Sequence, residues 1–204
     1  MERPAASLEP VVLEGGPVRL EPMAPSHHAG LVAVGLDPEI WRFMTPLVKS
    51  DADMREYMDV AAKMRDTGTS LPFVTIDRAS GAIAGSTRFA NYDGVNRRVE
   101  IGWTWLAPQW QRTALNTAAK YLMLTHAFER LGCVRVELKT DVLNTRSRNA
   151  MLRIGAREEG VLRKHILLWS GRWRDSIYFS VLDDEWPGVR TRLEEMMASR
   201  IANA

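Results

Sequence analysis

Alternating apolar and polar positions, together with short β-branched runs, predict seven β-strands along the chain. The predicted strands are Val18–Met23, Leu71–Asp77, Ala82–Phe89, Val99–Leu106, Val134 to about Asn144, Val161–Leu168 and Ser176–Leu182. The turn of residues 78–81, with the sequence Arg-Ala-Ser-Gly, has the composition of a hairpin connection. The second, third and fourth strands are therefore expected to pair antiparallel, one after another.

Apolar positions three or four residues apart predict helices in the remaining segments. The predicted helices cover residues 26–36, 51–64, 117–131, 145–154 and 184–201, with Asp51 or Asp53 capping the second. Gly132 is a plausible stop for the third helix. Because strands follow one another both directly and through helical crossovers, we expect a mixed α/β (α+β) fold with one mixed sheet.

The length and composition of the chain favour a single domain. The chain has 204 residues, and 46% of them are hydrophobic, which is enough for one sizeable core. We expect one domain over residues 1–204, with an N-terminal arm over residues 1–16 and a helical tail over residues 184–204. The formal net charge of +2 is too small to indicate a nucleic-acid partner. With no signal peptide and no apolar run of about 18 residues, we expect a cytoplasmic protein without a membrane partner.

The cysteine and the histidines indicate neither a disulfide nor a metal. Cys133 is the only cysteine, and it follows a glycine at a predicted helix-to-strand junction, so we expect it in the core. The histidines lack the spacing of metal ligands; they are His27, His28, His126 and His165. The sequence therefore predicts no metal site.

The most informative segment is the polar loop that leads into the third predicted helix. A helix that begins near Asn116 or Thr117 leaves about four backbone N–H groups unpaired, and its dipole places partial positive charge there. Such an end can bind phosphate, with help from the charge of Arg112 and from the side chains of Gln111 and Thr113. An ordinary capped helix with a solvated arginine explains this loop equally well.

A second strand-to-helix junction lies at Asn144 and Ser147, after the crossover helix. Two neighbouring parallel strands are therefore expected to end near each other. If these strands diverge, the gap exposes backbone donors and acceptors. An elongated ligand with amide groups, such as pantetheine, could pair with them as a substitute strand.

With these motifs in place, the sequence resembles the GNAT N-acetyltransferases, and within them the RimJ/RimL-like branch that contains the ribosomal-protein N-terminal acetyltransferases. The resemblance runs from about Val18 to Trp186. It rests on the residue 111–116 loop, on Asn144-x-x-Ser147 with Gly155, and on the segments 99–102, 175–178 and 184–187. It implies a GNAT fold with a mostly antiparallel sheet of six to seven strands, splayed central parallel strands and helices on both faces.

The resemblance also implies a reaction and a cofactor site. The reaction is the direct transfer of an acetyl group from acetyl-coenzyme A to a primary amine, on a protein N-terminus or a small molecule. The implied cofactor contacts are Trp105, Leu106 and Ala107 along the pantetheine arm, Gln111, Arg112, Thr113, Ala114, Leu115, Asn116 and Thr117 at the pyrophosphate, and Asn144 and Ser147. A backbone N–H near Trp105 or Leu106 would polarise the thioester carbonyl.

Three positions depart from the pattern of the family. Ala114 and Asn116 stand where the family loop usually has small residues that let the backbone approach phosphate closely. Met151 stands where many members carry a tyrosine that protonates the departing thiolate. Ser147 is a candidate substitute for that acid, although a serine in a first helical turn is commonly a backbone cap. These departures keep open an alternative, a catalytically silent acyl-coenzyme-A-binding regulatory protein.

Glu100 is the candidate for removing the proton of the acceptor ammonium group. It lies in a strand predicted to be central, where an apolar surround would favour the protonated carboxyl and make it a better base. The alternative is a structural carboxylate on the solvated side of the strand, paired with Arg97 or Arg98.

Aromatic residues are the candidates for the acceptor pocket, although such residues commonly pack in the core. They are Trp41, Phe43, Tyr92 and Trp103. The basic residues around Arg146 and Arg153 could meet a cofactor phosphate, but we favour a solvated face for most of them. The apolar and aromatic content of the last two predicted strands suggests a homodimer.

Overall fold

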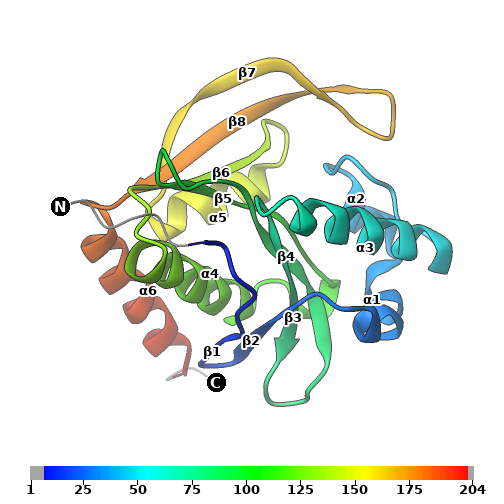
Figure 1. The fold of residues 1–204 in the computed structure, drawn as a ribbon, viewed down its shortest axis with the longest axis horizontal. Coiled ribbons are helices and arrows are strands. Elements are labelled where there is room, and N and C mark those ends of the chain that lie inside the picture. Colours follow the sequence, from blue (N-terminus) through cyan, green and yellow to red (C-terminus); the bar gives the residue numbers. More distant parts are fainter. Residues whose placement is uncertain (1–6, 202–204) are drawn as a thin grey trace.

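The computed structural model describes residues 7–201, which build one eight-stranded sheet with helices against both faces (Figure 1). The strands are β1 (Leu13–Gly15), β2 (Val18–Pro22), β3 (Leu71–Asp77), β4 (Ile83–Asp93), β5 (Arg98–Leu106), β6 (Arg135–Asp141), β7 (Arg157–Leu167) and β8 (Trp173–Leu182). Their order across the sheet is β1-β2-β3-β4-β5-β6-β8-β7. All neighbours are antiparallel except β5 and β6, so the predicted mixed, mostly antiparallel sheet is confirmed.

The sheet has one strand more than the six to seven predicted. The additional strand, β1, lies inside the predicted N-terminal arm and pairs with β2 from Leu13–Leu20 to Gly15–Val18. Gly16 allows the tight turn between them because its φ is +53°. Three residues are too few to show an alternation in the sequence. Residues 1–6 of the predicted arm and 202–204 of the predicted tail lie outside the described part of the chain.

The helices agree with the prediction in number and place, apart from short additions. They are η1 (Pro25–His27), α1 (His28–Gly35), α2 (Pro38–Trp41), α3 (Asp51–Asp66), η2 (Pro108–Trp110), α4 (Leu115–Thr125), the π-helical turn η3 (His126–Arg130), α5 (Thr145–Ile154) and α6 (Trp186–Ile201). The cap of α3 is Ser50, whose hydroxyl accepts from Asp53 N at 3.2 Å, and not Asp51 or Asp53. The short helix α2 was not predicted, since four residues show no helical period.

Two apolar cores lie on opposite faces of the sheet. The larger includes residues of α4, α5 and α6, and the smaller residues of α1, α2 and α3. Cys133 belongs to the larger core as predicted, and burial raises the pKa of its thiol to about 11. The β7–β8 hairpin arches over the face that carries α1, α2 and α3 (Figure 1). Among the described helices, none is long and apolar enough to cross a bilayer.

Candidate active site

The central parallel strands separate after a short contact, which confirms the predicted splay. β5 and β6 pair over three positions, from Arg98–Arg135 to Glu100–Glu137. Beyond them, β5 continues along β4 to the Gly85–Leu106 pair, and β6 continues along β8 to the Asp141–Ser176 pair. The two edges that face each other therefore leave a gap, narrow at Glu100 and wide at Leu106 and Asp141. Peptide groups along such edges can pair with an extended ligand.

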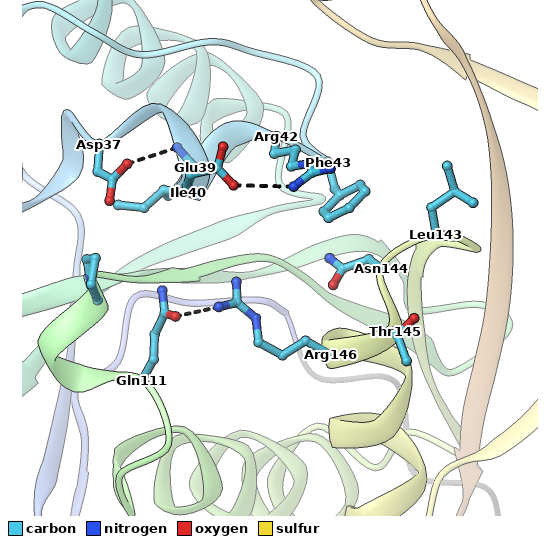
Figure 2. Close-up of a pocket in the computed structure, with 11 residues that line it drawn as sticks. Asp37, Glu39, Ile40, Arg42, Phe43, Gln111, Leu143, Asn144, Thr145 and Arg146 are labelled. Carbon is cyan, nitrogen blue, oxygen red and sulfur yellow. Dashed lines mark hydrogen bonds and ion pairs between the residues drawn. The ribbon is translucent and has the colours of Figure 1, made fainter.

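A cleft of about 360 Å³ opens at the wide end of this gap. Figure 2 shows Asp37, Glu39, Ile40, Arg42 and Phe43 on one side, Gln111 and Arg146 on the other, and Leu143, Asn144 and Thr145 at one end. Gln111 donates through Nε2 to the Leu106 carbonyl at 2.8 Å and accepts a hydrogen bond from Arg146 Nη1. The gap is thus bridged by side chains from both junctions. Arg146, for which a phosphate contact and a solvated face were both considered, is exposed and lines the cleft.

The N-terminus of α4 begins one or two residues earlier than predicted. Ala114 is its N-cap, with a φ of −70°, so this position needs no glycine. The positive φ of the loop, +64°, belongs to Arg112. The Thr113 hydroxyl donates to Trp110 O at 2.8 Å and accepts from Leu115 N at 3.2 Å. Thr113 therefore satisfies the loop and the helix end, and Asn116 lies within the first turn rather than at the cap.

Two further residues of this turn are buried. Leu115 packs in the larger core at 3% exposure. Thr117 is buried as well, and its hydroxyl has no hydrogen-bond partner within residues 7–201. The first-turn N–H groups and the Arg112 side chain are the features of this loop that suit a phosphate.

At the start of α5, the helix cap is Asn144 and not Ser147. Asn144 is the N-cap, and its Oδ1 accepts from Ser147 N at 3.1 Å. Ser147 is thus the capped residue, and its half-buried hydroxyl is not the cap. Met151, one turn further, packs against the larger core.

Glu100 is buried at 3% exposure, but its surround is not apolar. Its Oε2 accepts from Lys139 Nζ at 2.7 Å and from Asn91 Nδ2 at 2.8 Å. Both contacts are polar, so the expected apolar surround was wrong. Its other oxygen, Oε1, lies over Gly102, where an added Cβ would be 2.5 Å away.

The arginines expected as alternative partners of Glu100 are engaged elsewhere. Arg97 donates through Nε to Gly132 O at 2.7 Å, and Arg98 pairs with Asp93 and Glu137. The partner that the sequence analysis missed is Lys139, which β6 presents on the same face as Glu137. This face also carries His165, whose pKa is lowered by burial and by the charges of Lys139 and Arg174.

A second buried charge-bearing group lies on the opposite face of the sheet and was not predicted. Lys120 of α4 is 7% exposed, and its Nζ donates to Thr104 Oγ1 at 3.0 Å. Burial lowers the pKa of Lys120 from 10.5 to about 7. Thr104 Oγ1 in turn lies 2.7 Å from Thr87 Oγ1.

The predicted acceptor aromatics do not form one pocket. Phe43 lines the cleft. Trp41 is fully buried and packs with its ring centroid 5.3 Å from that of Trp105 in the smaller core. Tyr92 packs against the larger core, and burial raises its pKa. Trp103 is half-buried, and the Arg88 guanidinium lies 4.4 Å from its ring centroid.

Comparison with known proteins agrees with this geometry. Residues 18–157 match the family model described as the acetyltransferase (GNAT) domain. The chain belongs to the GNAT acetyltransferase family. The family is one of acetyltransferases, which bind acetyl-coenzyme A.

Individual relatives of this GNAT chain are bacterial. It is 38% identical over 110 residues to "Putative ribosomal N-acetyltransferase YdaF" of Bacillus subtilis, a match covering 54% of this chain and 59% of that relative. The chain thus spans less than two thirds of that relative's length. A GCN5-related N-acetyltransferase structure from Brucella melitensis is 33% identical, with a TM-score of 0.87 over 95% of this chain and 88% of the other. Mycobacterium smegmatis RimJ in complex with CoA-disulfide is 25% identical, with a TM-score of 0.77 over 94% and 96%.

The residues of this GNAT chain fit the cofactor of its family. The splayed edges offer peptide partners to an amide-bearing arm, and the α4 N-terminus offers backbone donors to a pyrophosphate. Arg112 and Arg146 supply positive charge beside that end. Within the described residues, no group of three or more His, Cys, Asp or Glu side chains is placed to hold a metal ion.

Proposed function

We propose that this protein is an acetyl-coenzyme-A-dependent N-acetyltransferase that transfers the acetyl group directly to a primary amine. The observation that carries the proposal is the gap between β5 and β6, because it combines open strand edges with two helix N-termini at its wide end. Bound acetyl-coenzyme A would supply the activated thioester. Its pyrophosphate would lie on residues 111–117 and its pantetheine arm along residues 105–107, with Asn144 as a further contact.

Glu100 is the proposed acceptor of the ammonium proton, acting directly or through a water molecule. Lys139 and Asn91 hold Oε2, which leaves Oε1 directed over Gly102 as the oxygen for the incoming amine. The side chain lies on the face of the sheet covered by α1, α2 and α3, so the amine would approach from that face. A backbone N–H at Trp105 or Leu106 would stabilise the negative charge that develops on the carbonyl oxygen.

The acceptor is proposed to be a protein N-terminus. The name of YdaF supports a ribosomal acceptor, since that relative is named as a putative ribosomal N-acetyltransferase. Asp37 and Glu39 at the cleft would attract a cationic amine.

The test is thiol release from acetyl-coenzyme A with a panel of peptides, amino acids, polyamines and aminated small molecules. We expect a melting-temperature increase with coenzyme A, because a ligand of the native state stabilises it, and thiol release that depends on one amine class. Cofactor binding without amine-dependent release would instead support a silent binding protein. No melting shift and no calorimetric signal at saturating cofactor would refute the cofactor assignment.

A homodimer through the β7–β8 hairpin is part of the proposal. β7 is an edge strand, and the hairpin exposes Val161, Leu162, Leu167, Trp169 and Trp173. Such an apolar set on an open edge suits a second copy of the chain. Light scattering of the purified protein measures the oligomeric state, and a monomer at micromolar concentration would contradict this part.

A further inference from the structure

The narrow end of the gap has an ionisable group on each face of the sheet, and a β-bulge separates them. Arg88 pairs with Gly102 and Ser86 pairs with Trp105, so one extra β5 residue lies between these pairs. Trp103, with a φ of +53°, takes up this extra residue. The bulge reverses the alternation, and Thr104 consequently faces α4 while Glu100 faces away from it.

Thr104 connects a buried amine to the open part of the gap. Thr104 is exposed, and it lies on β5 beyond the last β5–β6 pair. Its hydroxyl lies within hydrogen-bond distance of Lys120 Nζ at 3.0 Å, Thr87 Oγ1 at 2.7 Å and Gly102 O at 3.4 Å. Because an ammonium group can only donate, Thr104 accepts from Lys120, and its own proton can go to Gly102 O, to Thr87 Oγ1 or to a ligand in the gap.

Lys120 has no charged partner among the described residues. Its pKa of about 7 has burial as its cause, and its Nζ donates to the hydroxyl of Thr104, which in turn contacts the hydroxyl of Thr87. A buried lysine in this state exchanges a proton readily near neutral pH, which is the property of an acid-base group. Met151 of α5 has no proton to donate.

We propose that Thr104 donates the proton to the departing thiolate sulfur and that Lys120 resupplies Thr104. This proposal rests on the proposed function. As the carbon–sulfur bond breaks, its electron pair passes to sulfur, the Thr104 hydroxyl proton moves to sulfur, and a Lys120 ammonium proton moves to Thr104. Neutral Lys120 then regains a proton from solvent, and the proton lost by the acceptor amine leaves through Glu100. Thr104 is the catalytic residue and Lys120 a positioning residue that acts through it.

The arrangement assigns the two proton transfers to opposite faces of the sheet. The amine loses its proton on the Glu100 face, and the sulfur gains one on the α4 face. The two groups cannot neutralise each other directly, because the sheet separates them.

The test measures the thiol titration of coenzyme A itself while it is bound, by the ultraviolet absorbance of the thiolate, with desulfo-coenzyme A as the blank. Ionisation of the sulfur would raise the pKa of a lysine behind Thr104, so the thiolate and the Lys120 ammonium group stabilise each other. The bound thiol should therefore titrate at a pH about one unit lower in the wild type than in Lys120→Met. Thr104→Val keeps the lysine but removes the hydroxyl, and it should likewise raise the pH at which the bound thiol titrates. Thr104→Ser and the exposed-site control Lys63→Met should match the wild type.

Equal titration of the bound thiol in the wild type, Lys120→Met and Thr104→Val would overturn the relay while leaving the cofactor assignment intact. Failure of coenzyme A to bind the wild type would refute the proposed function instead. If Lys120→Met does not fold, Thr104→Val alone decides, since it alters an exposed side chain.

Discussion

Glu100 and Lys120 are buried almost equally, yet only Glu100 has an oppositely charged partner among the described residues. Glu100 is 3% exposed and Lys120 is 7% exposed. Glu100 has a lysine and an amide as hydrogen-bond donors, whereas Lys120 has a hydroxyl as its acceptor. The carboxylate therefore has a counter-charge, while the lysine loses its solvation without gaining one. The two buried groups thus differ in their partners rather than in their depth.

The largest expected effect comes from removing the carboxylate. Glu100→Gln should lower the acetylation rate at neutral pH by about a hundredfold to ten-thousandfold with cofactor affinity retained, because a general base typically contributes that much. The deficit should shrink as pH rises and free amine becomes abundant. The measurement is thiol release against pH, alongside calorimetric binding of coenzyme A.

The matched control for this prediction is Glu137→Gln, which removes a carboxylate from the same face at the paired position of β6. It should leave the rate near the wild-type value. Full activity of Glu100→Gln across the pH range would mean that Glu100 and Lys139 form a structural ion pair.

The buried Lys120 should make the free energy of unfolding depend on pH. The folded-state pKa of Lys120 is about 7, below its unfolded value of 10.5, so between these values the unfolded chain binds more protons. Its contribution to the free energy of unfolding therefore rises with pH over this range and is least favourable below pH 7. Lys120→Met should be the more stable protein there by about 2–4 kcal/mol, and this advantage should fade toward pH 10.5.

Urea unfolding at pH 6, 8 and 10 measures this difference, and Lys63→Met, at an exposed position of α3, is the control. The control should show no pH-dependent difference from the wild type. Parallel stability curves for the wild type and Lys120→Met would show that Lys120 keeps its charge with a partner in the folded protein.

The sequence alone predicted the sheet and the gap because both follow from local patterns. Alternation located β2 to β8, and the crossover helix between β5 and β6 required a parallel pair. The β1 strand and α2 were missed, since three or four residues carry no period. The N-cap at Ala114 was missed because alanine is not a typical cap residue, and only the backbone angles identify it as the cap.

The partners of the site residues could not be predicted, because they come from other elements. Lys139 alternates on β6 like any solvated residue, and only the three-residue β5–β6 register brings it to Glu100. Lys120 did carry a signal that was not used: it lies between Leu115, Ala119, Met123 and Leu124 on the apolar stripe of α4. A lysine on such a stripe indicates a buried amine, but its Thr104 partner depends on the bulge at Trp103.

A smaller effect is expected at the wide end of the gap. Arg112→Ala should weaken coenzyme A binding by about tenfold, because a charge-assisted contact to phosphate is worth about 1.5 kcal/mol or more. The effect should diminish with added salt, since Arg112 is exposed. Calorimetry at two ionic strengths measures it, with the exposed Arg153→Ala as a control for the change in net charge. An equal loss in both variants would indicate a general field rather than a contact at the loop.

The smallest effect is expected next to it, at Ala114. Glycine is useful where φ is positive or where the backbone must approach a ligand closely, but Ala114 has a helical φ of −70°, so Ala114→Gly relieves no strain. At an N-cap, glycine is somewhat preferred over alanine, so the start of α4 should persist. We therefore expect coenzyme A affinity to stay the same or to tighten by less than about twofold, since only a methyl group is removed beside the first-turn N–H groups. The same calorimetric titration measures this change. Loss of binding in Ala114→Gly, with Arg112→Ala unaffected, would show that this loop does not hold phosphate and would leave the strand edges as the remaining part of the cofactor site.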